Sequence, residues 1–481
     1  MRIALLRLPV LENKNRNRLI NPSSFISSQL YHQWLTRYPP MGLLYYASLL
    51  KQKGHEVNLI DAELMSCSVK RVFSKLSKFK PDIVCSSVNI FVPRFEFNCL
   101  RQLKDKLKFV LICRGHFPRL YPEETINNPH VDFAFTGKGF HSICQLTEAI
   151  QRGRDYAAIP GIIYRKGKEI IKTPEEPLFK LDDLPYPARE LLDNSIYTSA
   201  LSTRDKFTTI IGSAGCPYSC TYCEEKNTPF QTRDVNNIIA EMKECKYRFG
   251  INEVFFFDPT FTIDRARTMD FCQKLLKENL EMKWVIRTRA DLVDAALLEA
   301  MAKAGCIKIH YGLESGDQEI LDKLKRNIKL ETMKKAVELN VKNKIAVFGY
   351  FMIGNDGETI NSIRKTIVFA RSLPLNFAQF TQVAPIPQTD VFKASCEKLK
   401  VDLWLENYRK VSLATDVWKS QKTDLSNKTL RQWTNKAYLA FYLRPSYLWR
   451  TLNLRYAPFY IVRQLKIFFI ILRLKLANFF A

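Results

Sequence analysis

The chain of 481 residues contains neither a run of apolar residues long enough to span a membrane nor a compact nucleic-acid-binding motif. A membrane-spanning helix needs about 20 apolar residues. The apolar runs near the C-terminus, such as Ala437–Leu443 and Ile467–Leu472, are far shorter. No zinc finger or helix-turn-helix pattern is present. The first predicted strand, Arg2–Leu8, is not followed by G-x-G-x-x-G, which disfavours a dinucleotide-binding domain.

Acidic residues are also missing from the C-terminal region. None follows Asp424, whereas ten Lys or Arg occupy the last 57 positions. The whole chain has 73 basic and 48 acidic residues, a net charge of +25, which makes nucleic acid the first partner to consider. Because the tail alone carries ten of these 25 net positive charges and no compact nucleic-acid module accompanies the rest, we expect no nucleic-acid partner.

Residues 396–481 are predicted to form a helical, basic C-terminal region. A basic helix with large apolar residues can lie in the interface of an anionic membrane. One prediction is therefore peripheral contact with the inner membrane face. The alternative is a helix that packs its apolar side on the rest of the protein and leaves its cations in water. The sequence leaves both open.

Twelve cysteines without a signal peptide argue against a disulfide framework and favour a reducing, cytoplasmic location. Three of them, Cys216, Cys220 and Cys223, form a C-x-x-x-C-x-x-C run directly after the apolar segment 207–212. The other nine are scattered, several of them in apolar runs, and are predicted to be core residues: Cys67, Cys85, Cys99, Cys113, Cys144, Cys245, Cys272, Cys306 and Cys396.

Three thiolates with this spacing can surround one face of an iron–sulfur cube, each binding one iron. The fourth iron then has no protein ligand, and an open metal position is what a catalytic site needs. A zinc knuckle or three ordinary buried cysteines are the alternatives. A knuckle needs a fourth ligand nearby, and the closest candidates, Cys245 and His310, lie far along the chain.

The cysteine spacing, with the aromatic Tyr222 before the last cysteine, resembles the signature of the radical S-adenosylmethionine (SAM) enzymes. The resemblance implies a 4Fe-4S cluster on the three cysteines, with SAM bound to the free iron. It also implies an electron donor such as flavodoxin or ferredoxin, and cleavage of SAM to methionine and a 5′-deoxyadenosyl radical. Chemistry of this kind belongs to the cofactor, while the protein supplies position and exclusion of water.

Residues 1–150 alternate strand-like and helix-like segments, which predicts a Rossmann-like domain with a parallel sheet and helices on both faces. The strands are expected at Arg2–Leu8, Val57–Asp61, Asp82–Val88 and Phe109–Cys113, and the helices at Gly42–Gln52, Val69–Phe79, Phe95–Leu107 and His141–Ile150.

Several loops of this domain resemble the cobalamin-binding domain fused to many radical SAM enzymes, in phrases at 39–45, 53–57, 114–118 and 135–139. The resemblance implies that Gly42, Gly115, His116 and Gly137 contact cobalamin, since a flat macrocycle can approach where the backbone is bare. A generic Rossmann-like domain that binds a nucleotide, or nothing, is the alternative. The alternative for His116 is a structural role, in which its ring forms hydrogen bonds within the protein and contacts no cofactor.

Two departures from the cobalamin proteins stand out. None of the six histidines has an aspartate two positions before it, so the D-x-H-x-x-G motif that supplies a lower cobalt ligand elsewhere is missing. We therefore expect cobalt without a histidine ligand from the chain. Lys138 and Phe140 stand where the family loop usually carries acidic residues.

Residues 151–204 are interpreted as a connector containing a hairpin around Lys166-Gly167-Lys168. Residues 205–395 contain six strand–helix repeats, which predict a partial (β/α)6 barrel whose active site lies at the carboxyl ends of the strands. The expected strands are Thr208–Gly212, Glu253–Asp258, Lys283–Thr288, Cys306–Leu313, Ala346–Ile353 and Ala378–Val383.

Polar residues and glycines follow these strands. By resemblance, Tyr222 contacts SAM and Asp258 and Glu314 help to seat its ribose or methionyl part. Arg289 pairs with the SAM carboxylate, which suits a guanidinium fork. Gly312 lets the backbone approach the cofactor. Each polar residue alone could equally be a helix cap or a rim charge. No catalytic residue beyond these cofactor contacts is assigned.

The resemblance implies a cobalamin-dependent radical SAM enzyme of the class B methyltransferase type, acting on a small-molecule or lipid-like substrate. The expected reaction methylates an unactivated carbon or phosphorus centre: the deoxyadenosyl radical takes a hydrogen and the substrate radical receives methyl from cobalamin. A cyclase or ring-rearranging enzyme of the same architecture is the first alternative. A cobalamin- or redox-sensing binding protein is the second.

Overall fold

The computed structural model describes residues 1–9, 37–63, 68–199, 202, 206–400, 402, 404–406 and 425–447. These residues divide into two compact units. The first contains residues 1–9, 39–196 and 404–406, and the second contains the remainder, chiefly 206–400 and 425–447. Each unit is an α/β layer built on a sheet in which parallel strands predominate.

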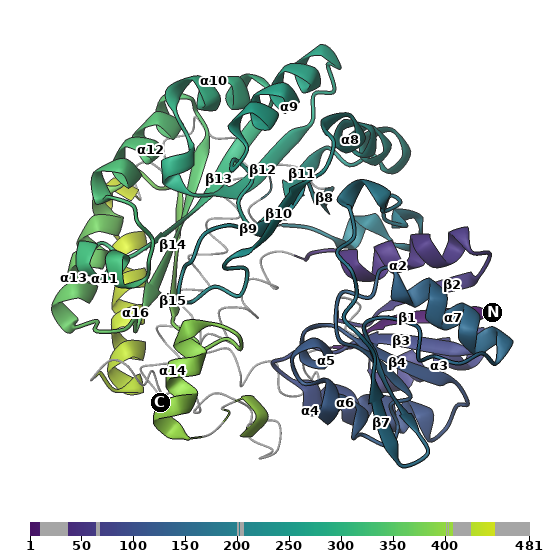
Figure 1. The fold of residues 1–481 in the computed structure, drawn as a ribbon. Coiled ribbons are helices and arrows are strands. Elements are labelled where there is room, and N and C mark those ends of the chain that lie inside the picture. The colour runs from purple at the N-terminus through teal and green to yellow at the C-terminus, as the bar shows by residue number, and fades with distance from the viewer. Residues whose placement is uncertain are drawn as a thin grey trace. The chain divides into compact units, whose positions relative to one another are not determined.

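The first unit has a seven-stranded sheet in the order β2-β1-β3-β4-β5-β6-β7 (Figure 1). The strands are β1 (Arg2–Arg7), β2 (Glu56–Asp61), β3 (Ile83–Ser87), β4 (Val110–Arg114), β5 (Phe133–Phe135), β6 (Ile162–Lys166) and β7 (Glu169–Lys172). β1 to β5 are parallel, and β6 and β7 extend the sheet antiparallel. The predicted hairpin therefore belongs to this sheet.

The helices of the first unit are α2 (Met41–Gln52), α3 (Val69–Phe79), α4 (Pro93–Lys104), α5 (His116–Leu120), α6 (Pro122–Ile126) and α7 (Ser142–Arg152). All four predicted strands and all four predicted helices are present, with ends shifted by at most three residues. β5, α5 and α6 were not predicted because three or five residues are too few to show a periodic pattern.

The second unit has a six-stranded, wholly parallel sheet whose strands are neighbours in chain order. They are β8 (Phe207–Ile210), β11 (Glu253–Phe256), β12 (Lys283–Thr288), β13 (Cys306–Glu314), β14 (Ala346–Ile353) and β15 (Phe377–Gln382). The predicted strands are confirmed. A separate two-stranded hairpin, β9 (Ser213–Cys216) with β10 (Thr228–Thr232), was not predicted.

Helices alternate with these strands and lie along the outer side of the sheet (Figure 1). They are α8 (Val235–Phe249), α9 (Arg265–Lys277), α10 (Ala295–Lys303), α11 (Gln318–Lys323), α12 (Leu330–Lys342) and α13 (Ile360–Ser372). α14 (Asp390–Leu399) follows β15. Aspartates cap the N-termini of four of them by accepting backbone N–H bonds, namely Asp234, Asp264, Asp294 and Asp317.

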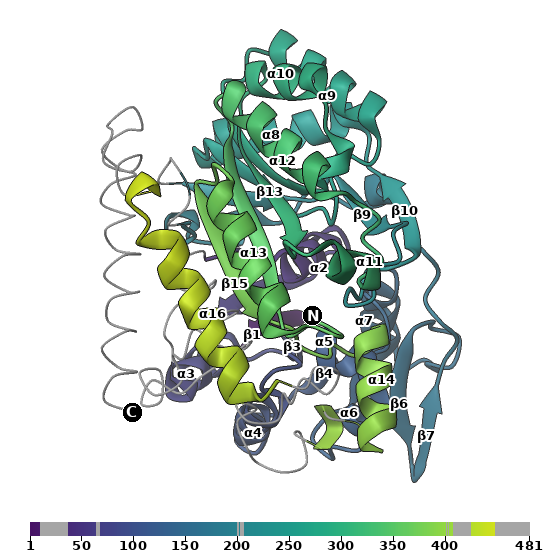
Figure 2. The same ribbon diagram turned by 90° about the vertical axis from the view of Figure 1, so that its left-hand side faces the viewer.

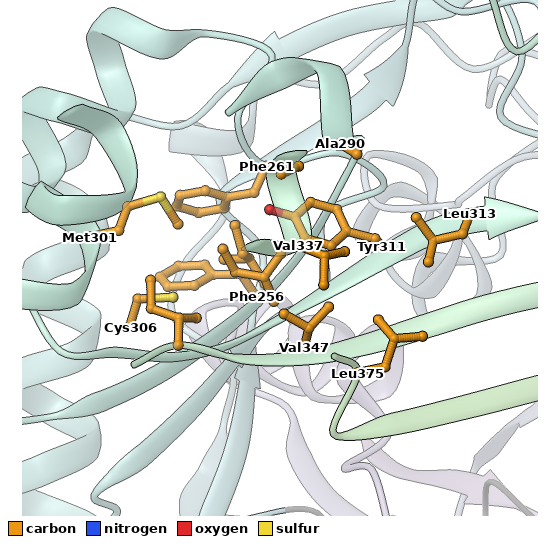
Figure 3. Close-up of a cluster of buried hydrophobic side chains, with 14 of the residues drawn as sticks. Phe256, Phe261, Ala290, Met301, Cys306, Tyr311, Leu313, Val337, Val347 and Leu375 are labelled. Atoms are coloured by element: carbon orange, nitrogen blue, oxygen red, sulfur yellow. The ribbon is translucent and has the colours of Figure 1, made fainter. Parts of the chain in front are cut away.

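The core of the second unit lies between the sheet and these helices (Figure 3). Phe256, Phe261 and Trp284 pack their rings together within it, with centroids 4.7 to 6.1 Å apart. Cys306 and Tyr311 of β13 both belong to this core although they are five residues apart, because the register with β12 shifts directly after Cys306. Because strand side chains alternate between faces, Phe207, Phe255 and Val285 lie on the other face of the sheet, where they form a smaller buried cluster.

α16 (Asn427–Tyr442) covers the edge strand β15 and also contacts α13 (Figure 2). Tyr442 Oη accepts from Ala378 N at 3.1 Å and donates to Ala378 O at 2.8 Å, while Tyr438 Oη accepts from Phe380 N at 3.2 Å. Ala437 and Phe441 are buried in the core. Much of the apolar run at 437–443 therefore packs on β15 and α13, whereas Leu443 at its end is exposed.

No helix among the described residues is long and apolar enough to span a membrane. The run Ile467–Leu472 and the rest of the chain after residue 447 lie outside the described residues, as do Cys67 and most of 401–424. Of the predicted core cysteines that are described, six are buried and two, Cys144 and Cys396, are half-buried.

Candidate active site

The three predicted cluster ligands lie in the hairpin formed by β9 and β10. Cys216 ends β9, and Cys220 and Cys223 lie in the loop that follows. The backbone N–H of Cys216 donates to Thr228 Oγ1 at 2.9 Å. Gly215, with a φ of 78°, faces β10 so closely that a Cβ would overlap a carbonyl oxygen of that strand. Only glycine therefore fits this position of the hairpin.

The thiols of these cysteines are gathered and shielded from water. Cys216 and Cys220 are buried, and Cys223 is half-buried. Burial raises the pKa of Cys216 and raises the pKa of Cys223 to about 12, and the neighbouring thiols add to both shifts. A thiolate is disfavoured in such a place unless a metal takes up its charge. The donor set therefore fits an iron–sulfur cluster.

In the part of the chain that the structure describes, no three His, Cys, Asp or Glu side chains converge on a single metal ion. A cube differs from a mononuclear site because each thiolate binds its own iron. The features that indicate an iron–sulfur cluster are therefore the spacing of the three cysteines in one hairpin and the burial of their side chains, complete for two and partial for Cys223.

Contacts with loops far along the chain anchor the hairpin. The N–H of Thr221 donates to Leu324 O at 3.3 Å, and Thr221 O accepts from the N–H of Asp390 at 2.9 Å. The side chains of Lys226 and Asp390 form an ion pair. The cysteine loop is therefore held by backbone at the end of α11 and at the start of α14, both in the same unit.

Glu314 and Gly312, both predicted to contact SAM, end β13. Glu314 has a φ of 61°, and the register between β13 and β14 shifts at this point, a bulge that redirects the side chain. Its Oε1 accepts from Tyr222 Oη at 2.9 Å. Burial raises the pKa of Glu314. A Cβ at position 312 would overlap Glu314 Oε1, so the glycine makes room for the carboxylate.

Asp258 follows β11 and is fully buried at the base of the hairpin. One carboxylate oxygen accepts from the N–H of Gly212 at 2.7 Å, and the other accepts from Ser213 Oγ at 2.6 Å. Burial raises the pKa of Asp258. Both oxygens already have protein donors, so the observed role of Asp258 is to hold the entry to the hairpin.

Arg289 follows β12 and lies beside the cysteine loop. Its guanidinium pairs with both oxygens of Asp291, at 2.9 and 2.8 Å, and stacks 3.9 Å from the ring centroid of Tyr218. Its Nη2 also donates to Arg326 O at 2.7 Å. Nη1 is buried without a hydrogen-bond partner. An unpaired buried donor of this kind fits an anionic ligand such as a carboxylate.

Two further buried side chains at this end of the sheet escaped the sequence analysis. Glu358 accepts from the N–H groups of Gly354 and Asn355, and its Oε1 has no partner. Arg326 Nη1 lies 3.5 Å from Cys220 Sγ. Glu358 lies in the polar, glycine-containing stretch that directly follows β14, and that position could have marked it as a candidate. Nothing in the sequence distinguishes Arg326 from its basic neighbours.

In the first unit, the predicted cobalamin contacts lie at the carboxyl edge of the parallel strands. Gly115, at φ 111°, follows β4, and a Cβ there would lie 2.7 Å from Val88 O after β3. A Cβ on Gly42 would lie 2.7 Å from Arg114 Nη1. His116 begins α5. The structure therefore brings Gly42, Gly115 and His116 to one place, around the end of β4.

Gly137 lies in the loop after β5, which is tied to the same edge. Tyr46 of α2 has its ring 4.7 Å from the Arg114 guanidinium carbon, and its Oη donates to Lys138 O at 2.7 Å. The carboxylate of Glu176 accepts from the N–H groups of Gly139 and His141 at 2.6 and 2.8 Å. Glu176 thus brings an acidic group to the loop in which Lys138 and Phe140 depart from the family pattern.

Comparison with known proteins agrees with this geometry. The family described as the radical SAM superfamily matches residues 210–370, from the end of β8 into α13. The chain contains a radical SAM domain. The matched segment includes the cysteine hairpin and every predicted SAM contact, which confirms the resemblance on which the sequence analysis relied.

Relatives extend the likeness beyond this domain. An uncharacterized methyltransferase of Pyrococcus horikoshii is 28% identical over 417 residues, covering 85% of this chain and 89% of that protein. An anaerobic magnesium-protoporphyrin IX monomethyl ester cyclase of Rubrivivax gelatinosus is 27% identical, covering 85% and 75%. A solved structure of the radical SAM methyltransferase TsrM from Kitasatospora setae, with cobalamin and a [4Fe-4S] cluster bound, has a TM-score of 0.64 at 18% identity, covering 82% and 75%.

Proposed function

We propose that the protein is a cobalamin-dependent radical SAM methyltransferase acting on an unactivated carbon or phosphorus centre. The observation that carries the proposal is a hairpin with three cysteines, two of them buried and one half-buried, fastened at the carboxyl ends of a six-stranded parallel sheet. Among the similar proteins, those from P. horikoshii and K. setae are named methyltransferases, which supports methyl transfer.

Cys216, Cys220 and Cys223 would hold the 4Fe-4S cluster. When bound, the cluster and SAM supply a 5′-deoxyadenosyl radical and cobalamin supplies a methyl group. The chain orients these groups and keeps water away. Arg289 offers a buried, unpaired Nη1 for the SAM carboxylate, and Glu314 is a buried acceptor next to the cysteine loop.

Cobalamin binding by the first unit is supported by its topology. In a parallel sheet ordered β2-β1-β3-β4-β5 the winding reverses between β1 and β3, and ligands of such folds bind at the carboxyl ends near that reversal. Gly42, Gly115, His116 and Gly137 lie along this carboxyl edge. The sequence contains no D-x-H-x-x-G motif. We therefore infer that the chain would supply no histidine ligand to the cobalt.

A ring-forming or rearranging reaction is the second candidate, because the R. gelatinosus relative is named a cyclase. The two differ in product mass, since methylation adds one CH₂ and rearrangement adds nothing. Four features stay predictions: a small-molecule or lipid-like substrate, a flavodoxin- or ferredoxin-like electron donor, a cytoplasmic location, and membrane contact through the C-terminal tail.

The test is anaerobic reconstitution of the full chain with iron and sulfide, followed by reduction with dithionite in the presence of SAM. We expect about four irons per chain, the content of one 4Fe-4S cube, and formation of 5′-deoxyadenosine. Cys220→Ala should lower the iron content and abolish deoxyadenosine formation because it removes one cluster ligand. Cys144→Ala, a half-buried cysteine of α7, is the matched control and should retain both.

Wild-type protein that binds no iron, or Cys220→Ala that still cleaves SAM, would contradict the proposal. A protein that binds iron and cobalamin but never cleaves SAM would instead support the sensor alternative.

A further inference from the structure

Arg326 lies in the loop between α11 and α12 and points at a cluster ligand. Its side chain is 6% exposed. Nη1 lies 3.5 Å from Cys220 Sγ, within hydrogen-bond range for sulfur, and Nη2 donates to Gly312 O at 2.6 Å. Left-handed residues on both sides, Lys325 and Asn327, with φ of 55° and 49°, bend the loop inward.

Among the described residues Arg326 forms no salt bridge, and its Nε is buried without a hydrogen-bond partner. The buried carboxylate of Glu314 interacts with it electrostatically but does not pair with it directly. The nearest polar groups are the Cys220 thiol, the Gly312 carbonyl and the Tyr222–Glu314 pair. A buried cation therefore faces a thiol that, in the proposed function, is a ligand of the cluster.

We propose that Arg326 raises the reduction potential of the 4Fe-4S cluster by donating a hydrogen bond, from a positively charged group, to Cys220 Sγ. The inference rests on the proposed function. Reduction adds one electron to the cluster and neither makes nor breaks a ligand bond. The added negative charge is stabilised by a nearby cation and by donors to the ligand sulfurs, which are known determinants of cluster potential.

A purely structural role is the rival explanation, because Arg326 also ties its loop to Gly312 O. That role predicts loss of folding or of iron when Arg326 is changed. It does not predict a shifted potential in a variant that still assembles its cluster. The reduction potential therefore separates the two roles, whereas activity alone would not.

The experiment uses the full chain, reconstituted anaerobically as wild type, Arg326→Met, Arg326→Gln and Arg326→Lys. Each is titrated with dithionite against redox mediators, and the reduced cluster is measured by electron paramagnetic resonance. For Arg326→Met and Arg326→Gln we expect the ratio of reduced to oxidised cluster at a fixed potential to fall about tenfold, equivalent to 59 mV for a one-electron couple. Arg326→Lys, which keeps a positive charge, should lie between these and wild type.

Arg265→Met is the matched control, because Arg265 is exposed and paired with Asp294. It should titrate like wild type. Variants at 326 that carry wild-type iron and titrate at the wild-type potential would overturn the inference, as would failure of all three to assemble a cluster. A wild-type protein without a cluster would refute the proposed function instead.

Discussion

At the scale of single residues, the site is built from buried polar groups whose partners come from other strands. Glu314 is a good example, since the sequence marks it only as a carboxylate after a strand. Its left-handed backbone, the room left by Gly312 and the hydrogen bond from Tyr222 all depend on tertiary packing. The sequence could predict which residue types gather at the strand ends, but not which oxygens would already be occupied, as those of Asp258 are.

Glu358 makes the stability of the second unit depend on pH. Burial raises the pKa of its carboxyl to about 7, against about 4.5 in the unfolded chain. A carboxyl whose pKa is higher in the folded state than in the unfolded state contributes its full stabilisation below the unfolded-state pKa. That contribution is lost as the pH rises through the folded-state pKa. At about 1.4 kcal/mol per unit, raising the pH from 4 to 8 should remove about 3 kcal/mol.

Urea unfolding of wild type and Glu358→Gln across this pH range checks the prediction. The free energy of unfolding of Glu358→Gln should lack this loss, while Glu338→Gln, at an exposed position of α12, should behave like wild type. Identical slopes for wild type and Glu358→Gln would contradict the assignment.

At the scale of elements, long segments were predictable and short ones were not. α3 and β14 appear with the predicted ends because each has a pattern many residues long. The β9–β10 hairpin was missed because Ser213-Ala214-Gly215-Cys216 has no strand-like alternation. It pairs because the glycine admits a close neighbouring backbone, and only the tertiary structure shows that neighbour.

Gly215→Ala should therefore disrupt the hairpin and with it the cluster site. The added methyl group meets both a left-handed φ and a carbonyl of β10, so we expect more than about 1 kcal/mol of destabilisation, and a large loss of bound iron. Gly153→Ala, at φ 62° with nothing within 4 Å of the new Cβ, controls for the backbone conformation alone. It should keep its iron, which is measured after anaerobic reconstitution. Equal iron in both variants would argue against the hairpin's role.

At the scale of the whole molecule, the alternation of strands and helices predicted two parallel α/β units. This alternation did not predict which segments extend or cover the edges of the two sheets. β6 and β7 extend the first sheet antiparallel, and α16 covers β15 of the second. Both depend on contacts between distant segments, such as Tyr442 with Ala378, that no local pattern encodes.

Tyr442→Phe tests the importance of this cover. It removes two hydrogen bonds to the Ala378 backbone and leaves both groups buried, so we expect a loss of about 2 kcal/mol in the free energy of unfolding. Tyr247→Phe, at a side chain that is 71% exposed, should change it by less than about 0.5 kcal/mol. Urea titration of both variants gives the comparison, and equal stabilities would show that α16 is not held by this residue.

The anchoring of the cysteine hairpin has a consequence for how the protein matures. Its three thiols are translated within eight positions of one another, yet the backbone that clamps their loop, at Leu324 and Asp390, is synthesised more than a hundred residues later. A nascent chain shorter than this carries all three predicted ligands without the backbone that holds their loop. In the proposed function, cluster assembly in a finished pocket therefore waits until the ribosome has passed Asp390.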